Sequence, residues 1–181
     1  MAIKHILLTS GEWSTKPSQL ITSDNFDFTQ QNLSEKNFSK SYLSQIDLSE
    51  KNLSYTDLSY SNLSNADLSN ADLSNADLTG SILVGANLSG ANLTNVKVHD
   101  ADLRNTNLKY SNLSFVDLSS SRITGADARN SNLSNAILQS HHISEMFLDG
   151  ANLSNADLSF TVFRSDDLSG ADLSGADLSY S

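Results

Sequence analysis

Carboxylates and hydroxyls are the side chains of this sequence that recur with a fixed spacing and could do chemistry. Through most of the chain an Asp or Asn is followed two positions later by a Ser or Thr, as in Asp67-Leu68-Ser69. Closely spaced carboxylates can transfer protons or bind cations. The same residues are also common turn formers, because their oxygens accept hydrogen bonds from nearby backbone N–H groups. The regular spacing favours the turn interpretation, and serine is too frequent for a neighbouring histidine to indicate a catalytic triad.

His141 and His142 form a possible metal-binding pair. Adjacent residues of an extended chain point to opposite sides, and no third ligand stands at a suitable spacing. The sequence also contains no cysteine. We therefore expect neither a metal site nor a cofactor.

The charge of the chain narrows the choice of partner. Twenty-one acidic residues against eleven basic ones give a formal net charge of −10. This charge disfavours direct binding to nucleic acid or to anionic lipid, and favours a neutral or basic partner. No apolar stretch is long enough to span a membrane, and the run Ile6-Leu7-Leu8 is too short for a secretory signal core. The expected protein is cytoplasmic and does not contact membranes.

A five-residue repeat must position all of these side chains. From Phe28 to Leu178 a central residue recurs at every fifth position, which makes 31 repeats without an insertion, and leucine occupies 24 of the 31 centres. On an α-helix this period would spread the leucines around the axis. On a flat strand it would point them alternately to opposite faces. Only a chain that turns a corner once per repeat keeps every centre inside, so the sequence predicts a solenoid.

The pattern Ala-(Asp/Asn)-Leu-(Ser/Thr)-X resembles the pentapeptide-repeat proteins over residues 26–181. The resemblance implies an all-β fold, a right-handed quadrilateral β-helix with one pentapeptide per side and about eight coils. The centre and the residue two before it would point inward, while the other three would face water. Inward positions such as Ala66 and Ala71 are small because leucines already fill each layer.

The two ends and one internal stretch depart from the repeat. Residues 1–25 carry no clear repeat, and we expect an N-terminal cap there. The first coil would be covered by Trp13, Leu20, Ile21 and Phe26. The last repeats are regular, so the final coil would expose leucines and backbone edges, which predicts a homodimer through the C-terminal end. Residues 137–147 are the least regular, with His141 and Met146 at inward positions, and a bulge or local loop is expected there.

Four repeats per coil place every twentieth residue in one row. Asp47 and Asp67 then belong to one acidic row, and Asp57 and Asp77 to another on the opposite side. Some pentapeptide-repeat proteins bind DNA gyrase as mimics of duplex DNA and protect it from quinolones. The acidic rows make that role an alternative for this chain, although it lacks the phenylalanine-rich centres, cysteines and loop insertions of those proteins.

Basic and aromatic residues interrupt the repeat after Lys97, at positions that should face solvent. Arginine beside exposed aromatic rings is typical of the energetic centres of protein interfaces. A plainer interpretation is that the basic residues neutralise neighbouring carboxylates in exposed ion pairs. The candidate partner-binding residues are Arg104, Lys109, Tyr110, Phe115, Arg122, Arg129, Phe160 and Arg164.

A rod filled with leucine offers no deep pocket for a substrate. The sequence therefore predicts a non-enzymatic protein that binds another protein through its sides, as a rigid scaffold without a cofactor. The alternative hypothesis is a DNA-mimicking inhibitor or protector of gyrase.

Overall fold

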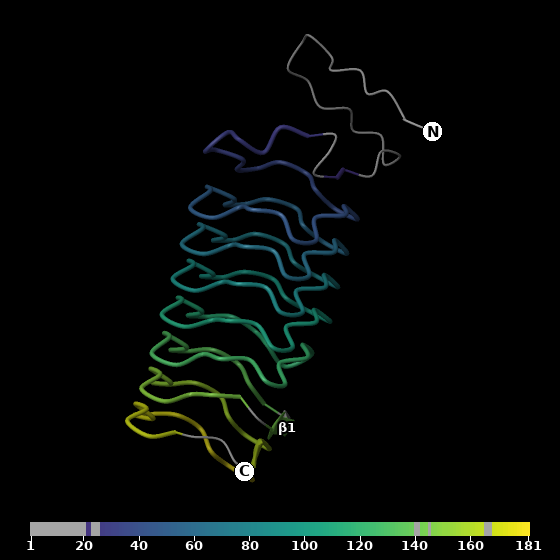
Figure 1. Ribbon diagram of the computed structural model, residues 1–181. Helices are drawn as coiled ribbons and strands as arrows, with labels where there is room; N and C mark the ends of the chain where they lie inside the picture. Colours follow the sequence, from purple (N-terminus) through teal and green to yellow (C-terminus); the bar gives the residue numbers. More distant parts are fainter. Residues whose placement is uncertain (1–20, 23–25, 140–141, 145, 165–167) are drawn as a thin grey trace.

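The computed structural model describes residues 21–22, 26–139, 142–144, 146–164 and 168–181. These residues form a stack of coils that follow one another in chain order, with residue 181 in the last coil (Figure 1). Two strands are long enough to be named, β1 (His142–Ser144) and β2 (Val162–Arg164). They pair in parallel, with His142 opposite Val162. Elsewhere in the described chain the ladder consists of single bridges that recur every five residues.

Every bridge joins residues that are 20 apart and parallel, as Asp47 to Asp67 and Asp67 to Asn87. One coil therefore contains four pentapeptides, and each side of a coil pairs with the same side of the next. The right-handed quadrilateral β-helix expected from the sequence is confirmed.

We call the four sides A to D in chain order, so that A is opposite C and B is opposite D. Their central residues repeat every twenty positions. Side A contains Leu48, side B contains Leu53, side C contains Leu58 and side D contains Leu63. A corner residue is counted with the side that it follows.

The corners explain which residues recur in the repeat. At a representative corner the N–H of Ala66 donates to the carbonyl of Leu63 at 3.0 Å, and Asn65 has a φ of 56°. A turn of this kind requires a positive φ at its third residue, where Asn and Gly are the least strained. Gly85 follows Asn65 one coil later, and a Cβ there would lie 2.5 Å from the Asn65 Oδ1 atom. The amide of Asn65 therefore fills the space that a side chain at residue 85 would need.

The Asx residue before each centre fixes the approach to the corner. The Oδ1 atom of Asp67 accepts a hydrogen bond from the N–H of Ser69 at 3.0 Å, and the same bond recurs along the chain. A carboxylate and an amide oxygen serve equally as acceptors, which explains why Asp and Asn alternate at this position. The turn role predicted for these residues is confirmed.

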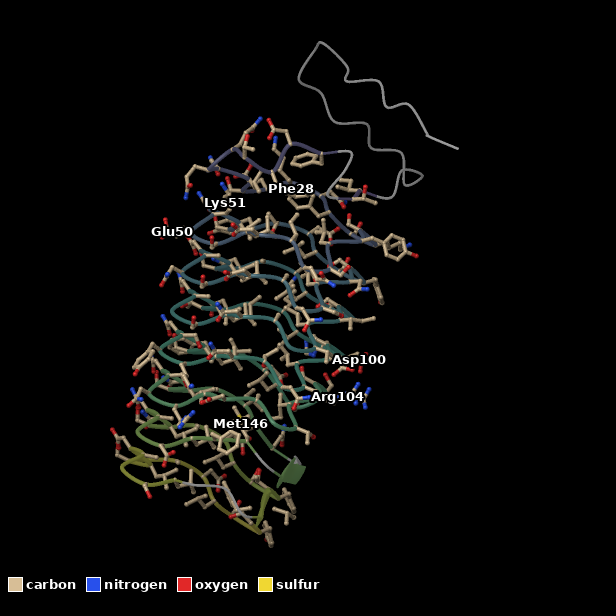
Figure 2. The ribbon with its side chains drawn as sticks, in the orientation of Figure 1. Phe28, Glu50, Lys51, Asp100, Arg104 and Met146 are labelled. Carbon is tan, nitrogen blue, oxygen red and sulfur yellow. The ribbon has the colours of Figure 1, made fainter. Side chains whose placement is uncertain are left out.

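The interior contains the two positions of each repeat that were predicted to point inward. Leu68 is fully buried and Ala66 is 1% exposed, and the other central leucines between residues 33 and 158 are buried in the same way. Met146 occupies the inward position that is alanine at residues 66, 86 and 126 of the same side, and it is also buried (Figure 2). Close packing of large and small side chains in each layer produces a continuous core.

The irregular stretch 137–147 keeps the register of the ladder. Ile137 pairs with Asp157, and Phe147 pairs with Asp127, each at the usual spacing of 20 residues. The expected bulge therefore does not shift the pairing of the described residues. Residues 140, 141 and 145, including His141, lie outside the described part of the chain.

The two ends of the stack are less buried than its middle. At the first coil the rings of Phe26, Phe28 and Phe38 pack together, with centroids 4.5 to 5.5 Å apart. Trp13 and Leu20, predicted to cap this coil, lie outside the described residues. At the other end Leu178 is 42% exposed, whereas Leu158 one coil earlier is fully buried. Within the described ranges no helix is long and apolar enough to cross a membrane.

Candidate protein-interaction surface

Asp102 on side D anchors two arginines. The Nε and Nη2 atoms of Arg104 donate to the two carboxylate oxygens at 2.7 Å each. Arg122, one coil further along the same side, donates from Nη1 to Asp102 Oδ2 at 3.1 Å. The hydrogen bonds from Arg104 are the main cause of the lowered pKa of Asp102. The carboxylate therefore stays ionised and holds both guanidinium groups.

Arg104 takes the place of the usual Ser without disturbing the turn. Its backbone N–H still donates to Asp102 Oδ1, at 3.3 Å, as a serine would at this position. The guanidinium then points away from the coil, and Figure 2 shows Arg104 on the outside of the rod. The repeat can therefore display an oriented arginine at no cost to its backbone pairing.

Two aliphatic side chains lie on side D in the preceding coil. Ile82 stands where Asp or Asn is usual and bridges to Asp102, and Val84 stands where Ser is usual. The ladder is intact, since the N–H of Leu63 donates to the carbonyl of Ile82 at 2.7 Å. Ile82 is nevertheless 44% exposed. Residues 81–85 form the one repeat with aliphatic residues at both outward positions of the side, a signal that sequence reasoning missed.

Asp127 on side A is the centre of a second cluster. Arg129 donates to its two oxygens from Nε at 2.8 Å and from Nη2 at 2.7 Å, and Lys109 Nζ lies 2.9 Å from Oδ2. Mainly through the hydrogen bonds from Arg129, the pKa of Asp127 is lowered to about 2. The guanidinium carbon of Arg129 also lies 5.7 Å from the centroid of the Phe147 ring, within the range of a cation–π contact. Phe147 is 45% exposed and was not predicted.

The two clusters lie on neighbouring sides of the rod. Asp127 follows Asp102 by 25 residues, which is one coil and one side. The corner between them carries Asn105 and Gly125, so no bulky side chain separates side D from side A there. Together the clusters form a continuous departure from the consensus surface.

Five of the eight predicted residues belong to these clusters. Arg104 and Arg122 share Asp102, and Lys109 and Arg129 share Asp127. Tyr110 lies at the corner beside the Asp127 cluster: its N–H donates to the carbonyl of Arg129 at 3.2 Å, and its side chain is 68% exposed. The ion pairs expected from the plainer interpretation are also present.

The other three predicted residues are not brought to these clusters. Phe115 is 60% exposed but occupies the corner between sides B and C, diagonally opposite to the corner at Asn105. The ring of Phe160 stacks on Tyr180 with centroids 4.8 Å apart. Arg164 is the last residue of β2 on side D, in register with Ser144.

The two acidic rows are interrupted by residues that are not acidic. On side A the row that contains Asp47 and Asp67 continues as Asn87 and Asn107, and Asn87 donates its amide to Asp67 at 3.1 Å. On side C the row of Asp residues is interrupted by Lys97, whose Nζ lies 3.9 Å from Asp77. Neither side presents an unbroken line of negative charge.

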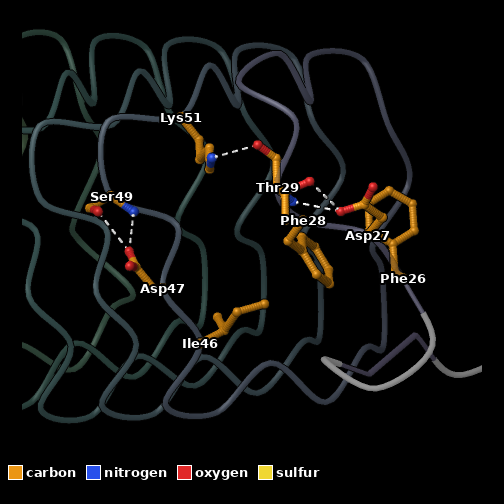
Figure 3. Close-up of a pocket in the computed structure, with 8 residues that line it drawn as sticks. All are labelled: Phe26, Asp27, Phe28, Thr29, Ile46, Asp47, Ser49 and Lys51. Carbon is orange, nitrogen blue, oxygen red and sulfur yellow. Dashed lines mark hydrogen bonds between the residues drawn. The ribbon is translucent and has the colours of Figure 1, made fainter.

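A shallow hollow of about 510 Å³ opens on side A at the first coils (Figure 3). Its lining includes Phe28, Asp27 and Asp47. Both carboxylates accept hydrogen bonds from the Thr or Ser two positions later, which lower the pKa of each. They are therefore ionised turn acceptors without the raised pKa that a general acid needs. The Nζ of Lys51 lies 3.2 Å from the carbonyl of Thr29.

Among the described residues no three His, Asp or Glu side chains come together as a metal site. His142 contributes its backbone to β1, and its neighbour in the suggested histidine pair lies outside the described residues.

These features define a class of protein: a four-sided solenoid with a filled interior, whose described arginines and their carboxylate partners lie on the outside. The family profile described as Pentapeptide repeats matches eight copies, over residues 37–75, 71–109, 111–145 and 148–179. The chain belongs to the pentapeptide-repeat family.

Solved structures of the same family resemble the chain. HetL, a pentapeptide-repeat protein involved in heterocyst differentiation regulation from the cyanobacterium Nostoc sp. strain PCC 7120, is 33% identical; the match covers 83% of this chain and 76% of HetL, with a TM-score of 0.25. Rfr23 from the cyanobacterium Cyanothece 51142 is 27% identical over 65% of this chain and 63% of its own, with a TM-score of 0.29. QnrB1, a plasmid-mediated fluoroquinolone resistance protein, is 19% identical over 86% of this chain and 87% of its own, with a TM-score of 0.39. No curated protein sequence matches the chain.

Proposed function

We propose that this protein is a rigid, non-catalytic rod that binds another protein through its sides. One observation supports the proposal most: basic, aromatic and aliphatic departures from the repeat lie on the outside of two neighbouring sides, around Asp102 and Asp127, while the central residues beneath them, Leu103, Ile123 and Ala128, stay buried. Arginine and exposed aromatic rings are the residues that dominate binding energy at protein interfaces.

The backbone of the rod favours this role. Each coil donates hydrogen bonds to both neighbouring coils, as Leu68 does to Asn87 at 2.7 Å and Asn87 to Ala66 at 2.9 Å. Side chains carried on such a frame are held in place before a partner arrives. Less conformational entropy is then lost on binding.

Capture experiments with two rods test this function. The first is the native chain, and the second restores the consensus at both clusters by replacing the departing residues with Asn or Ser. The changes are Ile82→Asn, Val84→Ser, Arg104→Ser, Lys109→Ser, Tyr110→Asn, Arg122→Asn, Arg129→Ser and Phe147→Asn. We expect the native rod to capture from an extract of its own cells a protein that the consensus rod does not. Equal capture by both rods would contradict the proposal.

Gyrase binding by DNA mimicry is the competing function. The net charge of −10 favours it, and the interruption of the acidic rows by Asn87 and Lys97 disfavours it. Duplex DNA presents one charge per about 1.7 Å without interruption, so a mimic needs long continuous rows. Inhibition of gyrase supercoiling by the native rod, or protection of gyrase from a quinolone, would replace the scaffold role with this one.

We also propose that two copies of the 181-residue chain associate through the last coil. The support is that Leu178 is 42% exposed, whereas Leu158, the equivalent residue one coil earlier, is fully buried. Exposed leucines at the end of a solenoid favour association. Replacing Leu178 with Ser is expected to convert a dimer, measured by light scattering, into a monomer. A native chain that scatters as a monomer at micromolar concentration would contradict this.

A further inference from the structure

The arginines at Asp102 have hydrogen-bond donors to spare. Arg104 uses Nε and Nη2, and Arg122 uses Nη1, to contact the carboxylate. Within the described chain the Nη1 atom of Arg104 and the Nε and Nη2 atoms of Arg122 have no acceptor. The side chain of Arg122 is also 62% exposed. Two guanidinium groups with fixed orientation therefore present free N–H groups to solvent, the arrangement that recognises carboxylates or phosphates.

A small apolar surface lies beside these donors. Ile82 is the neighbour of Asp102 in the ladder, and Val84 is in the same repeat on the same side. Together they place two branched aliphatic side chains one coil from the guanidinium groups. An anion alone would leave this apolar surface in water. A ligand that covers it must also carry an apolar group.

Side D differs in charge from the rest of the rod. Between Tyr42 and Thr124 its described outward residues include one acid, Asp102, and two bases, Arg104 and Arg122. Each of the other three sides carries more acidic than basic residues at its described outward positions. The charges of the other three sides are screened over about 8 Å at physiological ionic strength. The net positive charge of the described outward residues of side D therefore decides which ligand this side attracts.

We propose that Ile82, Val84, Asp102, Arg104 and Arg122, called here the Asp102 surface, dock an acidic and partly apolar segment of the partner protein. In this complex carboxylates of the segment accept from Arg104 and Arg122, while an aliphatic or aromatic side chain covers Ile82 and Val84. The inference rests on the proposed scaffold function and names the chemistry of its partner. Nucleic acid also carries anions, but it has no apolar side chain that would cover Ile82 and Val84.

A peptide titration tests the surface directly. The probes are a short synthetic peptide in which Glu alternates with Leu, its counterparts with Gln or Lys in place of Glu, and a short DNA duplex. Each is added to the isotope-labelled full chain and followed by NMR. We expect the Glu–Leu peptide alone to shift the signals of Ile82, Val84 and the Nε groups of Arg104 and Arg122 in a saturable way.

Variants assign the effect to the surface. Arg122→Ala should weaken binding of the Glu–Leu peptide about fivefold, as expected for one exposed ion pair. Ile82→Asn, which restores the consensus residue, should weaken it about tenfold through loss of apolar contact. Lys97→Ala is the matched control, because Lys97 is also an exposed base in an ion pair with Asp, but on side C. It should leave the affinity unchanged.

Three results would overturn the proposal: no saturable shift with the Glu–Leu peptide, equal binding of the Gln–Leu peptide, or stronger binding of the Lys–Leu peptide or the duplex at side D. These outcomes are separable from failure of the scaffold function. A partner captured equally by the native chain and by Arg122→Ala would leave the scaffold function standing and remove this surface from it.

Discussion

Arg122 reaches back one full coil to Asp102, with its Nη1 atom 3.1 Å from the carboxylate oxygen of a residue twenty positions earlier. Arg104, two positions after Asp102, donates two hydrogen bonds to the same carboxylate. In other repeats the Asx side chain closes its own turn, and in several it also bonds to the amide of the next coil, as Asp67 does to Asn87. At Asp102 the same side chain also orients two cations on the surface, which links the geometry of the repeat to its capacity for binding.

Replacing Asp102 with Asn should separate these two roles. The amide oxygen can still accept the backbone N–H of residue 104, so the turn remains, while both arginines lose their charged partner. Because the pairs are partly exposed, we expect the free energy of unfolding in urea to fall by no more than about 1 kcal/mol. Binding of the Glu–Leu peptide should fall as well.

The control is Asp57→Asn on side C, where the carboxylate accepts from the N–H and the hydroxyl of Ser59 and, among the described residues, from no arginine. This change should leave peptide binding unaltered. If Asp57→Asn reduced binding as much as Asp102→Asn, the orienting role of Asp102 would be wrong.

Asp127 should titrate well below an ordinary aspartate. Its pKa is lowered from 3.8 to about 2, with the hydrogen bonds from Arg129 as the largest cause. A carboxyl whose folded pKa is depressed stabilises the protein above its unfolded pKa, and this contribution is lost as the pH falls towards 2. A carbon-13 NMR titration of the carboxyl should show the low midpoint, and Arg129→Ala should raise it. A native midpoint near 3.8 would contradict the described geometry.

Removal of the hydroxyl from two buried serines of side D should change the free energy of unfolding in opposite directions. The Oγ atom of Ser61 donates to the carbonyl of Leu58 at 2.6 Å, whereas that of Ser81 has no partner among the described residues. Ser61→Ala should lower the free energy of unfolding by about 1 kcal/mol, and Ser81→Ala should raise it by about 1 kcal/mol. Both side chains are almost fully buried, so the pair is well matched. Equal effects of the two changes in urea titrations would count against the assignment.

The stack should be most sensitive to truncation of a leucine in its middle. Leu68 is fully buried between two coils, and Leu68→Ala should reduce the free energy of unfolding by about 2 to 5 kcal/mol through lost burial and the cavity left behind. Leu178→Ala at the 42% exposed position of the last coil should cost much less. Similar losses at both positions would be inconsistent with a layered core.

The five-residue period predicted a solenoid, because only a corner in every repeat can bury all the central leucines, and the resemblance to the pentapeptide-repeat proteins implied its four sides. Four repeats per coil then place Asp102 and Arg122, which are twenty residues apart, in one row. The same geometry explains why Phe115 is remote from the arginines: a step of five residues turns a corner, so residues close in sequence point in different directions. Residues twenty apart are the true neighbours on the surface.

Ile82 and Val84 were missed for a different reason. Exposed aliphatic side chains are common on protein surfaces, so Ile82 and Val84 do not stand out within their own repeat. Ile82 and Val84 form a candidate binding surface only together with Asp102 in the next coil and the arginines that this carboxylate binds. Sequence reasoning that compared each repeat with the one twenty residues later would have found the juxtaposition.

Site-specific photo-crosslinking in the cells that make this protein tests the central claim most directly. A photoreactive residue is placed at Val84 on side D or, in a second chain, at Ser74 on the opposite side B. We expect a discrete adduct with another protein from position 84 and none from position 74. Adducts of equal yield from both positions, or from position 74 alone, would contradict it.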